Sequence, residues 1–147
     1  MRAATETDHL RVLAVVDDWW GDPSGRLRTL VHRLFFEHFA GTSLIADRPD
    51  GTLAGFLVGF RSQSRPGVAY VHLAGVAPDL RRTGLGARLY QAFFDIARAR
   101  GATTVACVTS PGNTASIAFH TRLGFDVTVQ PDHGGPGVPR IVFTRRL

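Results

Sequence analysis

Two arginines and two glycines lie close together in the middle of the chain, in the segment Arg81-Arg82-Thr83-Gly84-Leu85-Gly86. Glycine has no Cβ, so an anionic ligand can approach the backbone of such a loop closely. An amphipathic helix is expected directly after the loop, and its positively polarised N-terminus favours negative charge. The arginine side chains add full positive charges. The segment is therefore typical of a site that binds a pyrophosphate.

Three anion-binding patterns compete for this segment. A P-loop needs a lysine after its glycines, and the chain contains no lysine. A dinucleotide-binding fingerprint needs a third glycine where this chain has Leu89, and it belongs at the start of a doubly wound sheet. The third pattern, Arg-x-x-Gly-x-Gly, is matched in full. ATP and NAD sites are therefore disfavoured.

The spacing of apolar residues predicts the elements that must position this loop. Strands are expected at His9–Val16, Ser43–Asp47, Leu53–Phe60, Val68–Ala77, Thr103–Val108, Phe125–Val129 and Arg140–Thr144. Helices are expected over residues 25–39, from Leu85 to about Arg100, and from the N-cap Asn113 to Leu123. The strand–helix–strand unit over residues 68–108 should form a right-handed parallel crossover, and the hairpins should be antiparallel. The order predicts an α/β (α+β) fold with a mixed sheet in one domain, 1–147.

Charge and composition narrow the choice of partners. All 17 basic residues are arginines, and the formal net charge is +5. Residues 1–50 hold eight acids and six arginines, whereas residues 51–147 hold four acids and eleven arginines, which suits an anionic ligand in the second part. The arginines are scattered, with no basic helix or aromatic–basic platform, so a nucleic-acid partner is disfavoured. An Arg-rich composition also follows from a GC-rich genome.

The single cysteine, Cys107, excludes an internal disulfide framework and a Cys-rich zinc site, and we predict no metal. Because it lies in a short apolar strand, it is expected to be an inert core residue. No basic-then-apolar leader opens the chain, and no apolar run approaches the ~20 residues that span a bilayer. A cytoplasmic protein without a membrane partner is therefore expected.

The chain resembles the GNAT superfamily of acyl-CoA-dependent N-acyltransferases. The pair Val76-x-Pro78 precedes the glycine segment. The later segment Asn113-x-x-Ser116-x-x-Phe119-His120-x-x-Leu123-Gly124-Phe125 is similar to the family's second signature, an Asn-capped helix that ends in Leu-Gly-Phe. The resemblance covers roughly residues 8–147. It implies a mixed, mostly antiparallel sheet flanked by helices, with a central parallel strand pair that splays.

The resemblance also implies acetyl-CoA as the cofactor. The glycine loop would hold the pyrophosphate, and the exposed strand edge before it would pair with the pantetheine arm. The residues assigned to the cofactor are Leu73, Ala74, Gly75, Val76, Arg81, Arg82, Thr83, Gly84, Leu85, Gly86, Ala87, Asn113 and Ser116. Two of these have simpler explanations, because Asn113 is a good helix cap in any case and Gly84 can serve the turn alone.

Acetyl transfer to an amine needs a base for the amine, hydrogen-bond donors for the oxyanion (here a backbone N–H near Val76) and an acid for the leaving thiolate. The family often has a Glu on the strand before the glycine loop and a Tyr on the later helix. This chain has neither, since residues 68–77 contain no carboxylate and His120 occupies the Tyr position. Strand alternation places Val68, Tyr70, His72, Ala74 and Val76 on one face.

We therefore predict the catalytic set His72, His120 and Tyr70. Of the two titratable groups on that strand face, His72 can accept a proton near neutral pH and Tyr70, with a reference pKa of ~10, cannot readily do so. His72 would be the base, directly or through water, and His120 the acid if it is kept cationic. The alternative is that His72 packs against the helices and His120 is a helix-surface residue, in which case Glu37 or solvent removes the proton.

Acidic and aromatic residues near the N-terminus are candidates for the acceptor pocket. The carboxylates and rings of Asp17, Asp18, Trp19 and Trp20 suit a cationic amine through ion pairing and cation–π contact, although the tryptophans can equally anchor a loop. Phe36 and Glu37 are further candidates. The predicted function is N-acetyl transfer to a small primary amine in a ternary complex, in a possible homodimer. The alternatives are a protein or peptide N-acetyltransferase and a non-catalytic acyl-CoA-binding regulator.

Overall fold

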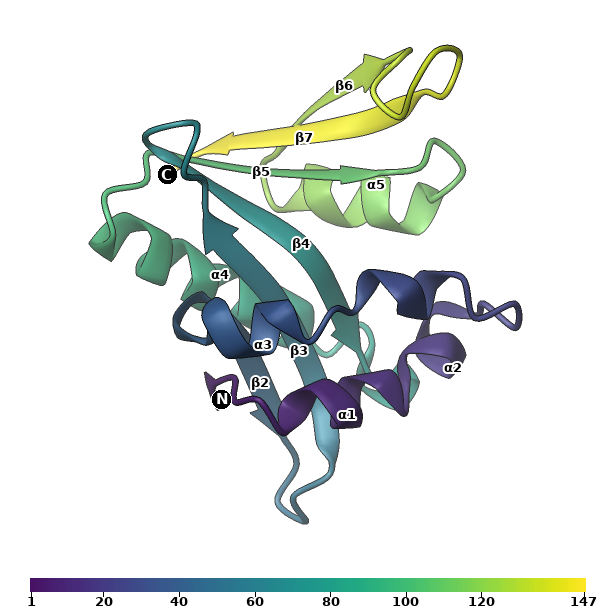
Figure 1. Ribbon diagram of the computed structural model, residues 1–147, viewed down its shortest axis with the longest axis vertical. Coiled ribbons are helices and arrows are strands. Elements are labelled where there is room, and N and C mark those ends of the chain that lie inside the picture. The colour runs from purple at the N-terminus through teal and green to yellow at the C-terminus, as the bar shows by residue number, and fades with distance from the viewer.

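The computed structural model describes all 147 residues, which form a seven-stranded mixed sheet with helices on both faces (Figure 1). The strand order is β1-β2-β3-β4-β5-β7-β6, and only β4 and β5 run parallel. The strands are β1 (Arg2–Ala3), β2 (Leu44–Asp47), β3 (Leu53–Arg61), β4 (Val68–Val76), β5 (Thr104–Thr109), β6 (Asp126–Gln130) and β7 (Arg140–Arg146). The predicted mixed, mostly antiparallel sheet is confirmed.

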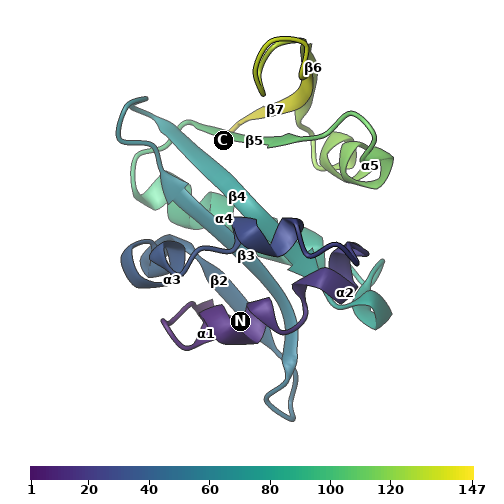
Figure 2. The same cartoon turned by 45° about the vertical axis from the view of Figure 1, so that its right-hand side comes forward.

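The helices divide between the two faces of the sheet (Figure 2). On one face lie α1 (Asp8–Leu13), α2 (Val16–Trp20) and α3 (Leu34–His38), and on the other α4 (Leu85–Ala99) and α5 (Thr114–Arg122). Three 3₁₀ turns complete the elements: η1 (Leu27–Leu30), η2 (Ala40–Thr42) and η3 (Pro78–Leu80). No helix is long and apolar enough to cross a membrane.

Two hydrophobic cores, one on each face, hold the sheet between the helices. Phe93, Phe94 and Phe143 are fully buried in the core between the sheet and α4 and α5. Phe36 and Phe56 are fully buried in the core between the sheet and α1–α3. Burying a large apolar side chain stabilises the fold by roughly 1.5–3 kcal/mol. Both faces of the central strands are therefore covered, as the continuous burial of β3 reflects.

The parallel pair splays, as the family resemblance implies. Pairing of β4 with β5 extends only from Val68 opposite Thr104 to Tyr70 opposite Ala106. Beyond this point both strands continue, but they diverge (Figure 1). The last part of β4 thus has a free backbone edge on its β5 side.

A β-bulge at His72 corrects the predicted strand alternation. Leu73 pairs with Val58, and Val71 with Gly59, so His72 is the extra residue of β4. An extra residue reverses the two-residue alternation beyond it. Tyr70 and His72 therefore face α3, where they contact phenylalanines, whereas Ala74 and Val76 pack against the α4 core. The single face predicted for all five residues is wrong.

The N-terminal third differs from the sequence expectation. The strand predicted at His9–Val16 is wrong, because α1 and the start of α2 occupy these residues. Val12 and Val16, four residues apart, are fully buried on one helical face while Leu10 is 69% exposed, a pattern that a short apolar run does not distinguish from a strand. The first strand is instead β1, which pairs with β2.

Two further N-terminal expectations are partly wrong. Residues 17–20, which lie between the strand and the helix predicted for this region and were assigned to neither, belong to α2, which ends at Gly21 in the left-handed conformation with φ +64°. The single helix expected over residues 25–39 is divided into η1 and α3, because Val31 between them has extended ψ (75°) and cannot continue a helix.

The remaining elements follow the sequence prediction. The β2–β3 hairpin, β4, α4, β5, α5, β6 and β7 all occur within about two residues of the expected bounds. Gly101 ends α4 with φ +79°. Asn113 caps α5, since its side-chain oxygen accepts a 3.1 Å hydrogen bond from the Ser116 N–H.

Candidate active site

The glycine loop forms an open cradle of backbone N–H groups. Arg82 and Gly84 have positive φ angles of 64° and 86°, which turn the chain sharply into α4. None of the N–H groups of residues 82 to 87 donates a hydrogen bond within the chain. They lie at the positive end of a 15-residue helix, so they fit a diphosphate group.

The two arginines of the loop have different roles. The Arg81 guanidinium donates to the carbonyl oxygen of Trp19 at the end of α2, so it fastens the N-terminal helices to the loop. Arg82 is exposed and its side chain forms no hydrogen bond or ion pair, which leaves its charge beside the cradle. Arg88, which the sequence analysis did not select, donates to the Thr83 carbonyl at 3.3 Å and adds a second charge there.

The other predicted cofactor residues lie on the two sides of the splay. Leu73, Ala74, Gly75 and Val76 form the free edge of β4, which leads directly to the glycine loop. On the opposite side, Asn113 donates from Nδ2 to the Thr109 hydroxyl at 3.1 Å, which ties the start of α5 to the end of β5. The structure thus brings the predicted set together around one opening.

Gly86 explains how α4 and α5 approach each other. A Cβ on this residue would lie 3.3 Å from the Phe119 ring of α5 and 3.7 Å from a methyl group of Val76. The glycine therefore serves helix packing as well as the cradle.

His72 lies at the point where the strands separate. Its Nε2 is 3.1 Å from the Leu30 carbonyl oxygen, which can only accept, so Nε2 carries the proton and Nδ1 is free as a base. Burial lowers the pKa of His72 below its ordinary value of 6.5, and the nearby His32 lowers it further, while the bond to Leu30 opposes this. His72 is therefore neutral at physiological pH.

Three phenylalanines that the sequence analysis did not assign to the site surround His72 and Tyr70. The Phe35 ring lies 4.4 Å from the His72 ring, and Phe60 lies 5.5 Å from Tyr70. Phe39 contacts both Phe35 and Phe60. The i, i+4 spacing of Phe35 and Phe39 was the available signal, since it places both rings on the same side at the C-terminal end of α3.

His120 is buried between α5 and the sheet. Its Nδ1 donates to the Ser116 carbonyl at 2.8 Å, which leaves Nε2 to accept from the Tyr90 hydroxyl at 2.8 Å. The ring stacks on Phe143 at 4.2 Å, and burial lowers the pKa of His120. Both ring nitrogens are thus occupied, and the neutral form is favoured.

The predicted acceptor residues of α2 are placed mainly in packing roles. Trp19 is 9% exposed and stacks on Phe56 at 5.9 Å, and Trp20 contacts the same ring at 6.1 Å. Asp18 is exposed, while Asp17 forms an ion pair with Arg28 at 3.2 Å. One carboxylate oxygen of Asp17 is buried without a hydrogen-bond partner.

The two acceptor candidates of α3 point away from His72. Phe36 is 1% exposed in the core beneath the N-terminal helices, and its neighbour Phe35 takes the position beside the histidine. Glu37 is exposed and bonded to Arg33, which lowers the pKa of its carboxyl. It forms no hydrogen bond or ion pair with His72.

Cys107 is buried on β5, and burial raises the pKa of its thiol to about 12. At neutral pH it is a thiol and a poor nucleophile, which agrees with the expectation of a core residue.

The chain is similar in sequence to a known protein family and to several known enzymes. The sequence profile of the Acetyltransferase (GNAT) family matches residues 12–125. The L-2,4-diaminobutyric acid acetyltransferase of Nocardia farcinica is 33% identical over 102 residues, which cover 67% of this chain and 52% of that protein. The L-methionine sulfoximine/L-methionine sulfone acetyltransferase of Pseudomonas aeruginosa is 42% identical over 59 residues, or 40% of this chain and 34% of that protein.

These first two relatives are longer proteins, of which the chain spans about half or less. Among solved structures, the fold is similar to that of the diaminobutyrate acetyltransferase EctA from Paenibacillus lautus, in complex with L-2,4-diaminobutyric acid and coenzyme A. The TM-score is 0.75 at 22% identity, and the match covers 97% of this chain and 92% of that one. This likeness shows a shared fold.

Proposed function

The chain belongs to the acetyltransferase (GNAT) family, and from that premise we propose that it transfers an acetyl group from acetyl-CoA to the primary amine of a small molecule. The observation that carries the proposal is the continuity of the cradle, the free β4 edge and His72 around the splay. An acyl thioester held there supplies an activated carbonyl. The relatives named above act on small amines, which supports this acceptor class.

The backbone of residues 82–87 would bind the CoA pyrophosphate, with Arg82 and Arg88 adding charge. This placement aligns the pantetheine arm with the edge of β4 from Leu73 to Val76 and leads the thioester toward His72. Holding the thioester and the amine together lowers the barrier by removing the translational entropy of their encounter.

In the proposed chemistry, the acceptor ammonium loses a proton to Nδ1 of His72, directly or through water. The imidazolium that forms keeps its Nε2–H bond to the Leu30 carbonyl, which stabilises the cation. The amine lone pair attacks the thioester carbon, and a backbone N–H of the β4 edge near Val76 stabilises the oxyanion. Collapse breaks the C–S bond and releases the CoA thiolate. The nitrogen loses its second proton to water, which leaves the neutral amide, and water returns a proton to the thiolate.

The hypothesis that His120 protonates the leaving thiolate has the least support from the geometry of the site. The prediction that His120 is the acid is not tested, and two features of the site disfavour it: burial lowers the pKa of His120, and Tyr90 occupies Nε2. Tyr70 remains near the base as a site residue, and burial raises the pKa of its hydroxyl. We propose that His120 positions α5 against α4 and that solvent supplies this proton.

The test measures thiol release from acetyl-CoA with a panel of small amines. We expect His72→Ala to lower kcat by roughly 10²–10⁴-fold, the usual contribution of a general base. His38→Ala, which removes an exposed histidine of α3, is the control and should retain parental kcat. At saturating amine, kcat should fall with acidification around a midpoint below 6.5, since His72 must be neutral to act.

Two results would replace this proposal with an alternative. Tight CoA binding without thiol release from any amine would favour a non-catalytic acyl-CoA-binding regulator. Transfer to peptide N-termini but to no small amine would favour a protein acetyltransferase. Equal kcat for His72→Ala and the parent would instead remove His72 from the mechanism and leave Glu37 or water as the base.

A further inference from the structure

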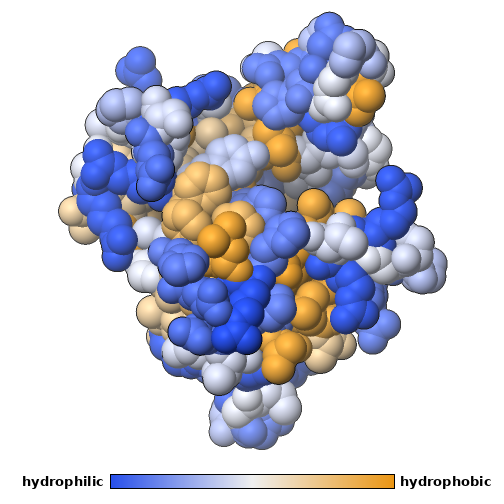
Figure 3. Space-filling model, in the orientation of Figure 1, coloured by the Kyte–Doolittle hydropathy of each residue, from blue (hydrophilic) through white to orange (hydrophobic).

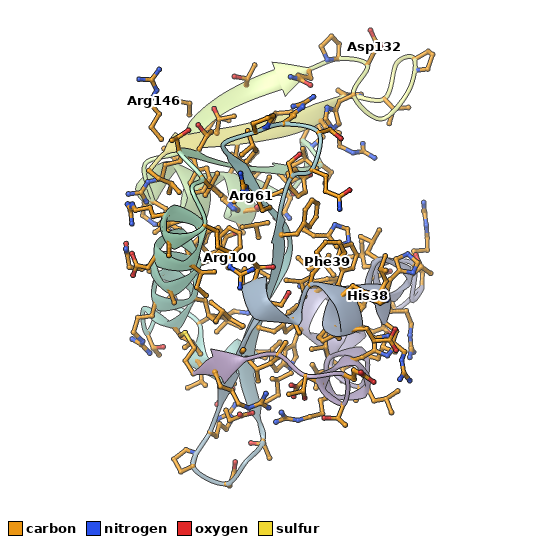
Figure 4. The ribbon with its side chains drawn as sticks, turned by 60° about the vertical axis from the view of Figure 1, so that its left-hand side comes forward. His38, Phe39, Arg61, Arg100, Asp132 and Arg146 are labelled. Carbon is orange, nitrogen blue, oxygen red and sulfur yellow. The ribbon has the colours of Figure 1, made fainter.

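Five half-buried rings form a continuous aromatic surface on the α3 side of the sheet: Phe35, Phe39, Phe60, Tyr70 and His72, called here the aromatic cluster. Adjacent ring centroids lie 4.4–6.1 Å apart, from His72–Phe35 to Phe35–Phe60. Phe39 lies nearer the strands than the exposed His38 at the end of α3 (Figure 4). Such rings offer flat apolar faces and edges to whatever lies beside them.

The aromatic cluster adjoins the proposed reaction centre. His72 belongs to both, and Tyr70 is the last residue of β4 that pairs with β5. The surface is hollowed between the N-terminal helices and the β5–β7 part of the molecule, with hydrophobic residues along the hollow (Figure 3). A group attached to the attacking amine would therefore extend over these rings.

The charges around the aromatic cluster are unsuited to a highly polar acceptor. No arginine makes a cation–π contact with its rings, since the one such contact joins Arg145 to Phe94. His72 bonds to a backbone carbonyl, and the only titratable group that shifts its pKa is His32. Arg61 follows Phe60 on β3 and so points to the other face. A carboxylate or second ammonium on the acceptor would be desolvated here without a counter-ion, which costs free energy.

We propose that the acceptor is a primary amine joined by a short alkyl chain to an aromatic ring, and that Phe35, Phe39 and Phe60 select that ring. This inference rests on the proposed function and names its substrate class. The short chain follows from the contact between Phe35 and His72, which leaves little distance between the base and the rings. This acceptor class differs from the amino-acid acceptors after which the two relatives are named.

The first test compares kcat/KM for 2-phenylethylamine, n-butylamine and L-2,4-diaminobutyric acid by thiol release. We expect 2-phenylethylamine to be preferred by roughly tenfold or more, the scale of an aromatic contact and the area it buries. Phe39 packs against Phe35 and Phe60 rather than against His72, and Phe39→Leu keeps an apolar side chain there. This substitution should lower the preference for 2-phenylethylamine to about threefold or less. Leu10→Ala, at an exposed apolar position on α1, is the control and should leave the preference unchanged.

Calorimetric titration of the CoA-bound protein with the same amines separates the two proposals. If kcat/KM for n-butylamine or diaminobutyric acid equals that for 2-phenylethylamine, the proposed acceptor class is wrong, while the proposed acetyl transfer stands. If no amine releases thiol, acetyl transfer fails, and the titration decides the subsite. The aromatic subsite is supported if 2-phenylethylamine binds more tightly than the other two amines and Phe39→Leu weakens that binding. Equal affinities for the three amines overturn it. Phe60→Leu replaces Phe39→Leu if thermal unfolding shows that the latter is not folded.

Discussion

His120 illustrates how a single residue can occupy a catalytic position in the sequence and a structural one in the fold. Its two ring nitrogens bond to the Ser116 carbonyl and the Tyr90 hydroxyl, which join α5 to α4. A buried polar group is tolerated only when its hydrogen bonds are satisfied, and here both are. The His120 ring thus acts as a core side chain and fixes the position of α5 relative to α4.

This environment makes stability depend on pH. Because burial lowers the pKa of folded His120 below 6.5, folded and unfolded states are both neutral above that value. Below it, the unfolded chain binds a proton first, so the free energy of unfolding falls by up to about 1.4 kcal/mol per pH unit. We expect His120→Phe to flatten this dependence between pH 8 and 5, measured by urea unfolding. Equal slopes for parent and variant would contradict the assignment.

At the scale of elements, the glycine loop and α4 act as one anion-binding unit. Gly84 has φ +86°, and an added Cβ would lie near the cradle, with only an arginine terminus 3.4 Å away. The same helix ends at Gly101, which has φ +79° and open space around the position of a Cβ. The two glycines therefore form a matched pair with the same backbone requirement and different surroundings.

Substitution of this pair separates backbone strain from ligand binding. Gly84→Ala and Gly101→Ala should each lower stability by about 1–2 kcal/mol, the cost of a left-handed non-glycine residue. Only Gly84→Ala should weaken CoA binding, by roughly tenfold or more, because it disturbs hydrogen bonds to a charged group. Calorimetry with CoA and thermal unfolding provide the two measurements. Equal CoA affinity in both variants would argue against the cradle.

At the scale of the whole molecule, Asp8 fastens the N-terminal segment to the sheet. Its carboxylate is 1% exposed and bonds to Arg2 at 2.7 Å, to Arg11 at 2.7 Å and to Thr5. Both arginines continue to Asp47 at the end of β2. These bonds hold the pKa of Asp8 well below its usual range, so the carboxylate stays ionised. The N-terminal helices that carry Leu30 and Phe35 toward His72 depend on this anchor.

We expect Asp8→Asn to lower the free energy of unfolding by about 2–4 kcal/mol, because two arginines lose a buried partner. Asp95→Asn, which breaks an exposed ion pair with Arg98 on α4, is the control and should cost less than about 1 kcal/mol. Urea unfolding at neutral pH measures both. Similar losses of unfolding free energy in the two variants would show that the buried network around Asp8 contributes no more than an exposed ion pair.

The features that depend on local chain geometry could be predicted from the amino-acid sequence. The glycine loop, the Asn113 cap, the α4 periodicity and the crossover from β4 to β5 were all predicted, because left-handed turns, caps and helical faces involve residues within a few positions of one another. The same local patterns carried the resemblance to the family. They place the cofactor loop without any knowledge of distant contacts.

Contacts between segments that are distant in the sequence set which side chains surround the reaction centre. The bulge at His72 depends on the register between β4 and β3, and the bond from His72 to Leu30 joins residues 42 positions apart. The choice of Phe35 over Phe36 depends on how α3 lies on the sheet, and the Tyr90–His120 pair depends on the approach of two helices. Pairing between distant segments is set by packing of the whole chain, which periodicity within one segment does not contain.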